Sequence, residues 1–234
     1  MTATSTSIPV APASSRRRTL GVACGAHALH DGFTDLIYVL LPIWQMQFGL
    51  GYAQVGMLRA FYAGTTAAFQ VPSGMLAERT SGRMVLAAGT AIAALGYLLA
   101  GASTGFALLA VALVVGGLGA SVQHPVASNL VAHAFEGHRS RAALGTYNFA
   151  GDLGKMALPA LTALLVAWLT WRPAVTLLGL IGLAGAAAVL LLAPRVAQAA
   201  VAAGPETAVP VSASAPARGG FPLLLAIGMI DSAT

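Results

Sequence analysis

The chain has 234 residues, of which 57% are hydrophobic and 8% charged, and its formal net charge is +5. A water-soluble domain carries about 25% charged residues, so this composition excludes one. The basic residues lie scattered between apolar segments instead of forming one patch, which excludes a nucleic-acid partner. The partner that the composition predicts is the lipid bilayer.

Six apolar runs, each long enough to cross a membrane, follow one another along the chain. About 20 apolar residues span the hydrocarbon core as a helix, because a helix rises about 1.5 Å per residue and satisfies its own backbone hydrogen bonds. The runs begin near Leu20, Tyr52, Met84, Phe106, Ala142 and Pro173. We therefore expect an all-α membrane protein with a six-transmembrane-helix bundle over residues 20–193.

The two ends of the chain differ from the bundle in composition. Residues 1–19 are rich in Ser, Thr, Ala and Pro and predict a disordered cytoplasmic tail, and residues 194–220 have the composition of a cytoplasmic linker. Residues 221–234 begin another apolar run that is too short to cross a bilayer, which indicates the truncated start of a seventh transmembrane helix. We expect a missing C-terminal six-helix half as a partner of the bundle.

Basic residues mark alternate connections between the runs. They precede the first run and follow the second, fourth and sixth: Arg16, Arg17, Arg18, Arg79, Arg83, Arg139, Arg141, Arg195 and Arg218. The other connections contain one basic residue among them, Arg172. The excess of arginine and lysine on the cytoplasmic side of membrane proteins predicts a multi-pass protein of the inner (plasma) membrane with a cytoplasmic N-terminus.

Ionisable residues interrupt four of the six runs, whereas the third and sixth contain no charge. Helix rise places five of these residues about 15 to 22 Å from the cytoplasmic side: Asp31, Asp35, Arg59, Asp152 and Lys155. Each would cost about 2.5 to 3.5 kcal/mol facing lipid at the bilayer centre, so they must face one another or water. We expect the first, second, fourth and fifth runs to surround a cavity, with the third and sixth at the lipid face.

Two interpretations of this charged layer stay open. In the first, Asp35 pairs with Arg59 and Asp152 pairs with Lys155, and the pairs only orient the helices. In the second, the layer binds a substrate or a coupling proton, the usual role of intramembrane ionisable groups. Three acids against two bases leave one carboxylate without a fixed partner, and Asp31 is the candidate proton acceptor. Lys155 is the candidate for binding an anionic or zwitterionic substrate group.

Histidines suggest a second chemistry. His27, His30 and Asp31 lie within two turns of one predicted helix, and with His124 they could bind a divalent metal. No acidic cluster surrounds the histidines, so we interpret them as polar contacts between helices and predict neither a metal site nor a cofactor. Transport of a metal such as iron stays open as an alternative.

Catalysis is not expected from this sequence. A membrane enzyme would need a nucleophile or a metal set facing the cavity, and the chain contains no H-E-x-x-H helix. A membrane scaffold that keeps the bundle without transporting is an alternative of another class.

The segment after the second run carries a recognisable motif. Residues 74–83 read GMLAERTSGR, which resembles the G-x-L-(A/S)-D-R-x-G-R-R signature of the major facilitator superfamily, with a glutamate in place of the usual aspartate. The resemblance implies a cytoplasmic conformational latch in which Gly74 permits close helix approach and Gly82 supports a tight turn. The latch residues are Gly74, Glu78, Arg79, Gly82 and Arg83.

Three further segments resemble the fosmidomycin-resistance group of drug exporters in that superfamily. They read HALHDGFTD at 27–35, SVQHP at 121–125 and NFAGDLG at 148–154. The resemblance implies the N-terminal half of a twelve-helix major facilitator fold, and a secondary transporter that exports small molecules, antibiotics among them, in exchange for protons by alternating access. The candidate substrate and proton pathway is His30, Asp31, Asp35, Arg59, Gln123, His124, Asn148, Asp152 and Lys155.

Overall fold

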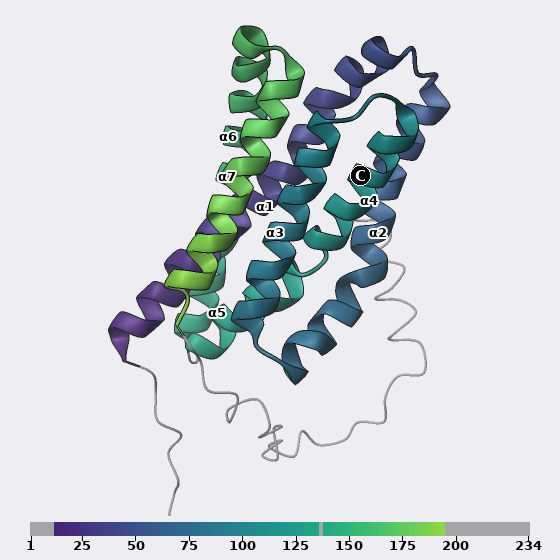
Figure 1. The fold of residues 1–234 in the computed structure, drawn as a ribbon. Coiled ribbons are helices and arrows are strands. Elements are labelled where there is room, and N and C mark those ends of the chain that lie inside the picture. Colours follow the sequence, from purple (N-terminus) through teal and green to yellow (C-terminus); the bar gives the residue numbers. More distant parts are fainter. Residues whose placement is uncertain (1–11, 136–137, 195–234) are drawn as a thin grey trace, which may run out of the picture. The chain divides into compact units, whose positions relative to one another are not determined.

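A computed structural model describes residues 12–135 and 138–194 of the chain. Within these ranges all regular structure is helical (Figure 1). The helices are α1 (Ala13–Phe48), α2 (Tyr52–Arg79), α3 (Gly82–Gly101), α4 (Phe106–Ala120), the π-helical turn η1 (Gln123–Ala127), α5 (Ser128–Ala134), α6 (His138–Leu169) and α7 (Trp171–Leu192). The segments α4, η1 and α5 together form the predicted fourth run.

Four of these segments are long and apolar enough to cross a membrane: Gly82–Gly101, Phe106–Ala134, His138–Leu169 and Trp171–Leu192. Helices α1 and α2 have 36 and 28 residues, more than a crossing requires, but they contain polar residues along their length, Asp31, Asp35 and Arg59 among them. The predicted fold class, an all-α membrane protein, is confirmed.

The fourth run changes its helical geometry in the middle. Pro125 has no N–H to donate, and its ring would clash with the carbonyl four residues earlier in a regular α-helix. The backbone widens here into the π-helical turn η1, a local irregularity that is often found at functional sites. This turn packs against α1, α2 and α3 and carries His124.

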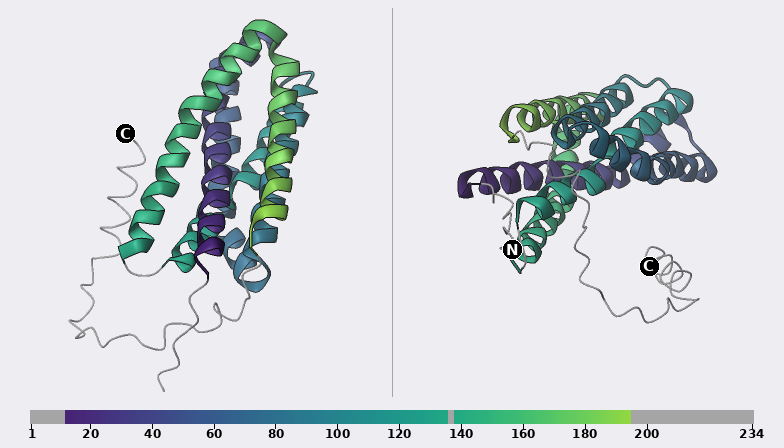
Figure 2. Two further views of the ribbon diagram at one scale, coloured as in Figure 1. Left: turned by 90° about the vertical axis from the view of Figure 1, so that its left-hand side faces the viewer. Right: turned by 90° about the horizontal axis from the view of Figure 1, so that it is seen from below.

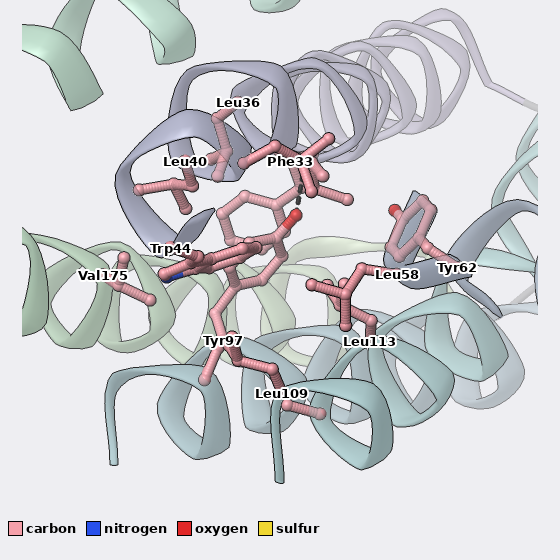
Figure 3. Packing of buried hydrophobic residues seen from close by; sticks show 14 of the residues in the cluster. Phe33, Leu36, Leu40, Trp44, Leu58, Tyr62, Tyr97, Leu109, Leu113 and Val175 are labelled. Carbon is pink, nitrogen blue, oxygen red and sulfur yellow. Dashed lines mark hydrogen bonds between the residues drawn. The ribbon is translucent and has the colours of Figure 1, made fainter. Parts of the chain in front are cut away.

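Helix packing is arranged around α1 and α3. Helix α1 lies beside α6 and α7, while α3 packs against α4 and α7, and α2 packs against α4 (Figures 1 and 2). The largest apolar cluster joins α1, α2, α3, α4 and α7, and Figure 3 shows Phe33, Trp44 and Tyr97 within it. The Tyr97 hydroxyl donates a hydrogen bond to the Phe33 carbonyl, which satisfies a polar group inside this core.

Helix α1 begins earlier than the sequence predicts. Its first residue is Ala13, so residues 13–19, which we expected to be disordered, are helical. Pro12 precedes the helix and the arginines that follow are good helix formers. The Arg18 guanidinium also donates a hydrogen bond of 3.5 Å to the Leu191 carbonyl at the end of α7, a contact between distant residues that the local composition does not reveal.

The predicted linker at 194–220 and the predicted start of a seventh helix at 221–234 lie outside the described residues, apart from Pro194, which ends the second described range.

Candidate functional site

A polar cavity of about 280 Å³ lies between α1, α2, η1 and α6. Its lining residues are His30, Asp31, Thr34, Asp35, Arg59, Tyr62, Ala63, Thr66, Ala67, Gln70, His124 and Lys155. They come from the first, second, fourth and fifth runs, and neither α3 nor α7 contributes a lining residue. The predicted division between four cavity helices and two others therefore holds for this cavity.

Asp31, in the cavity wall, lies within 4.0 Å of three ionisable side chains. One oxygen, Oδ1, lies 3.3 Å from His27 Nε2 and 3.9 Å from His30 Nε2. The other oxygen, Oδ2, lies 3.4 Å from Lys155 Nζ on α6. The Asp31 side chain is buried, and a buried carboxylate needs such partners because it has lost its hydration.

Glycines let α6 approach this part of α1. A Cβ atom added at Gly151 would lie 2.6 Å from Asp31 Oδ2 and 2.6 Å from His27 Cε1, and Gly154 packs directly against the backbone of Ala28. Small residues at helix crossings in membranes allow this close contact. The close approach brings Lys155 within reach of Asp31.

Lys155 joins two carboxylates. Its ammonium lies 3.2 Å from Asp152 Oδ1, one turn earlier on α6, as well as 3.4 Å from Asp31 Oδ2. The predicted pair of Asp152 and Lys155 is therefore present, and it is extended across the helix interface. The Asp152 side chain itself is 67% exposed and does not line the cavity.

Arg59 has a different partner from the one predicted. Its Nε donates a 3.0 Å hydrogen bond to the Tyr38 hydroxyl, and its guanidinium carbon lies 5.0 Å from the centre of the Tyr38 ring. The expected ion pair between Asp35 and Arg59 is not among the ion pairs of 4.0 Å or less in the described ranges. The two residues line the same cavity, but Tyr38 lies within reach of the guanidinium and accepts its hydrogen bond.

The carboxylate without a fixed partner is therefore Asp35 and not Asp31. Asp35 is half-buried, lines the cavity and makes no ion pair within residues 12–135 and 138–194. The prediction that Asp31 lacks a fixed partner was wrong, because Lys155 on α6 reaches across to α1, and spacing along the sequence does not show a contact between two helices.

The other predicted pathway residues divide into two groups. His30 and His124 line the cavity, and their rings meet edge-on with centres 5.1 Å apart. Gln123 is buried and Asn148 is exposed, and neither lines the cavity.

The uncharged polar face of α2 was not predicted from the sequence. Tyr62, Thr66 and Gln70 follow Arg59 at helical spacing and line the same cavity. Residues three or four positions apart lie on one face of a helix, so periodicity counted from Arg59 could have found them.

The latch residues lie where α2 ends and α3 begins. Their contacts differ from those that the resemblance to the superfamily motif implies for Gly74 and Gly82. Arg83 donates a 3.1 Å hydrogen bond to the Leu190 carbonyl at the end of α7. A Cβ atom at Gly74 would lie 3.5 Å from Pro125 Cβ, an ordinary contact, so an alanine would fit. Gly82 does not have a left-handed backbone, so its turn does not require glycine. Glu78 makes no ion pair among the described residues.

The connection between α3 and α4 contains the letters G-A-S-T-G at 101–105, a pattern also found around nucleophilic serines. Here it joins two helices instead of following a strand, and Ser103 is fully buried. Arg172 donates hydrogen bonds to the carbonyls of Gly101 and Ser103, at 3.2 and 2.5 Å. The segment is a structural connection between helices.

An all-helical membrane bundle with a charged cavity among four of its helices is the architecture of a transport protein. Residues 23–232 match the family model described as "Major Facilitator Superfamily". The chain belongs to this superfamily of membrane transporters, which points to transport rather than catalysis.

Two known proteins are similar to the chain. The "Fosmidomycin resistance protein" of Escherichia coli (strain K12) is 31% identical over 144 residues, which cover 61% of this chain and 35% of that protein. A bacterial homolog of the human lysosomal transporter Spinster, in an inward-facing and occupied conformation, has a similar fold with a TM-score of 0.68 and 20% identity, over 81% of this chain and 47% of the other. The matched part of this chain thus covers about a third of the length of the Escherichia coli protein and about half of the length of the Spinster homolog.

Proposed function

We propose that this bundle is the N-terminal part of a proton-coupled secondary transporter that exports small molecules by alternating access. The observation that carries the proposal is the cavity itself, because carboxylates, an ammonium, a guanidinium and imidazoles line one space inside an apolar bundle. Charged groups are costly at membrane depth and are kept there where they bind substrates or ions.

In this proposal Asp35 carries the coupling proton. It lines the cavity without an ion pair such as the one that joins Asp31 to Lys155, so a proton can reach it without first breaking a contact between helices. Lys155 and Arg59 supply positive charge at the same cavity, which favours a substrate with an anionic or zwitterionic group.

A second helical bundle covers the exposed face of α6 in the complete transporter. Asn148 is exposed, and the side chains of Asp152 and Lys155 are 67% and 46% exposed, in the middle of an otherwise apolar helix. Lipid would penalise these groups, so protein or a water-filled pathway must face them. The length of the matched Spinster homolog, about twice the aligned part, fits a second bundle in that place.

The remaining assignments follow from the loops. Arginines at the end of α2 and at the starts of α3 and α6 favour a cytoplasmic location for these helix ends at the inner membrane, with the N-terminus on the same side. There the latch segment, residues 74–83, would hold the two bundles in one conformation, with Arg83 fixing the start of α3 to the end of α7.

The test is transport in proteoliposomes with an imposed proton gradient. We would reconstitute the chain alone and the whole gene product that contains it, with a panel of drugs led by fosmidomycin, which the name of the Escherichia coli relative suggests. We expect proton-driven flux from the whole product, loss of that flux in Asp35→Asn, and no flux from the chain alone. Flux from the chain alone would refute the need for a second bundle. A folded product without flux of any compound would favour the scaffold alternative.

A further inference from the structure

Three potential metal ligands meet beside the cavity, and two of them, Asp31 and His124, line it. His27, Asp31 and His124 each offer one ligand atom, and these atoms all lie within 4.8 Å of one another. His27 and Asp31 are one turn apart on α1, whereas His124 comes from η1, almost a hundred positions later in the chain. The folded bundle, and not a local sequence motif, brings them together.

The hydrogen bonding of His27 determines which of its nitrogens can bind. Its Nδ1 lies 2.9 Å from the carbonyl oxygen of Tyr147, which can only accept, so Nδ1 carries the proton. In the neutral ring Nε2 then has a lone pair, and this atom is buried without a hydrogen-bond partner in the described part of the chain. Histidines that bind metals typically donate their other N–H to a carbonyl in this way.

The lone pair of His27 faces a negative charge. Its Nε2 lies 3.3 Å from Asp31 Oδ1, and two electron-rich atoms at this distance repel each other unless a proton or a metal ion lies between them. The separation is also close to the roughly 3.4 Å between two ligands of a tetrahedral ion with bonds of about 2.1 Å. The His27 ring is held in place, because it is 4% exposed and stacks on Tyr147 with ring centres 3.9 Å apart.

We propose that His27 Nε2, Asp31 Oδ1 and a ring nitrogen of His124 bind one divalent transition-metal ion of the Zn²⁺ type. Two imidazoles and a carboxylate are a donor set that zinc accepts, and three protein ligands leave a fourth position for water or another ligand. Asp31 and His124 line the cavity, so that position opens toward it. The proposal does not depend on proton coupling or on the identity of an exported compound.

Lys155 opposes the metal. Its ammonium lies 3.4 Å from Oδ2, the other oxygen of Asp31, so it shares the carboxylate with the ion and repels it. Removing this positive charge should therefore strengthen metal binding, which is the opposite of what general damage to the site would do.

The experiment measures Zn²⁺ binding to the full 234-residue chain, purified in detergent, by competition with a chelator of known affinity. We expect one ion per chain, at least tenfold weaker binding in His124→Ala, and at least threefold tighter binding in Lys155→Met. The control is the double variant His133→Ala/His138→Ala, which removes two exposed histidines and should bind Zn²⁺ like the wild type. Elution volume and helix content by circular dichroism verify that each variant is folded.

Two results would overturn the proposal. One is a wild-type affinity in folded His124→Ala, and the other is loss of binding in the His133/His138 control, which would place the ion on the surface. If His124→Ala does not fold, Lys155→Met decides, because unchanged or weaker binding in that variant contradicts a metal on Asp31.

Discussion

At the scale of single residues, two aspartates one turn apart on α1 have different surroundings. Asp31 contacts His27 and Lys155, while Asp35 faces the cavity without an ion pair in the described ranges. From helix rise the sequence placed five charges in one layer, and four of them line the cavity, while Asp152 does not. The sequence did not predict the pairing, because rise does not determine where each side chain points or how far its neighbours reach.

We expect Asp31→Asn to lower the free energy of unfolding by about 1 to 3 kcal/mol. The amide removes the anion that Lys155 and His27 contact and leaves polar groups at a helix interface unsatisfied. Asp35→Asn is the matched control and should stay within about 0.5 kcal/mol, because no ion pair of the described chain is lost. Denaturant unfolding in detergent micelles measures both, and equal losses in the two variants would contradict the assigned contacts.

A second residue-scale prediction concerns Gly151. The added Cβ atom of Gly151→Ala would lie 2.6 Å from Asp31 Oδ2 and from His27 Cε1, so α6 must move away from α1. We expect a loss of about 1 to 3 kcal/mol in the free energy of unfolding, as in other overpacked interfaces. Gly145→Ala on the same helix is the control, because its Cβ would have no neighbour within 4 Å, and it should be neutral or slightly stabilising. Equal stability of the two variants would refute the close packing.

At the scale of helices, the number and order of the apolar runs were predictable, because length and hydrophobicity are local properties of the sequence. Two features were not. These are the π-helical turn at Gln123–Ala127 and the early start of α1 at Ala13. Pro125 alone does not predict the turn, because Pro42 and Pro159 lie inside regular α-helices. Both features are accompanied by contacts between segments far apart in the chain, such as η1 with α1 and Arg18 with Leu191.

The end of α7 gives a prediction at this scale. Arg83 donates to the Leu190 carbonyl, and a cation at a helix C-terminus is favourable both as a donor and through the helix dipole. Arg83→Ala should lower the free energy of unfolding by about 0.5 to 1 kcal/mol. Arg79→Ala, in the same connection but without a hydrogen bond to the described chain, should leave it unchanged. Denaturant unfolding curves of the two variants measure these losses. A larger loss of stability in Arg79→Ala than in Arg83→Ala would contradict the assignment of the stabilising contact to Arg83.

At the scale of the whole molecule, orientation in the membrane is the property that the bundle alone does not determine, because a helical bundle packs equally well either way up. The arginines after α2 and α5 supply the missing information. One crossing, Phe106–Ala134, separates the connection at Thr104 from the connection at Arg139, so these two positions must lie on opposite sides of the bilayer.

Single cysteines at these two positions test the orientation, in a Cys24→Ser background that removes the native thiol. Arg139→Cys, in the first turn of α6, should react with a membrane-impermeant maleimide only after cells are permeabilised, because the arginine-rich start of α6 is retained in the cytoplasm. Thr104→Cys, at an exposed position of the opposite connection, should react with intact cells. If Arg139→Cys is labelled in intact cells and Thr104→Cys is protected, the orientation is the reverse of the one assigned here. The latch segment at 74–83 would then lie outside the cytoplasm.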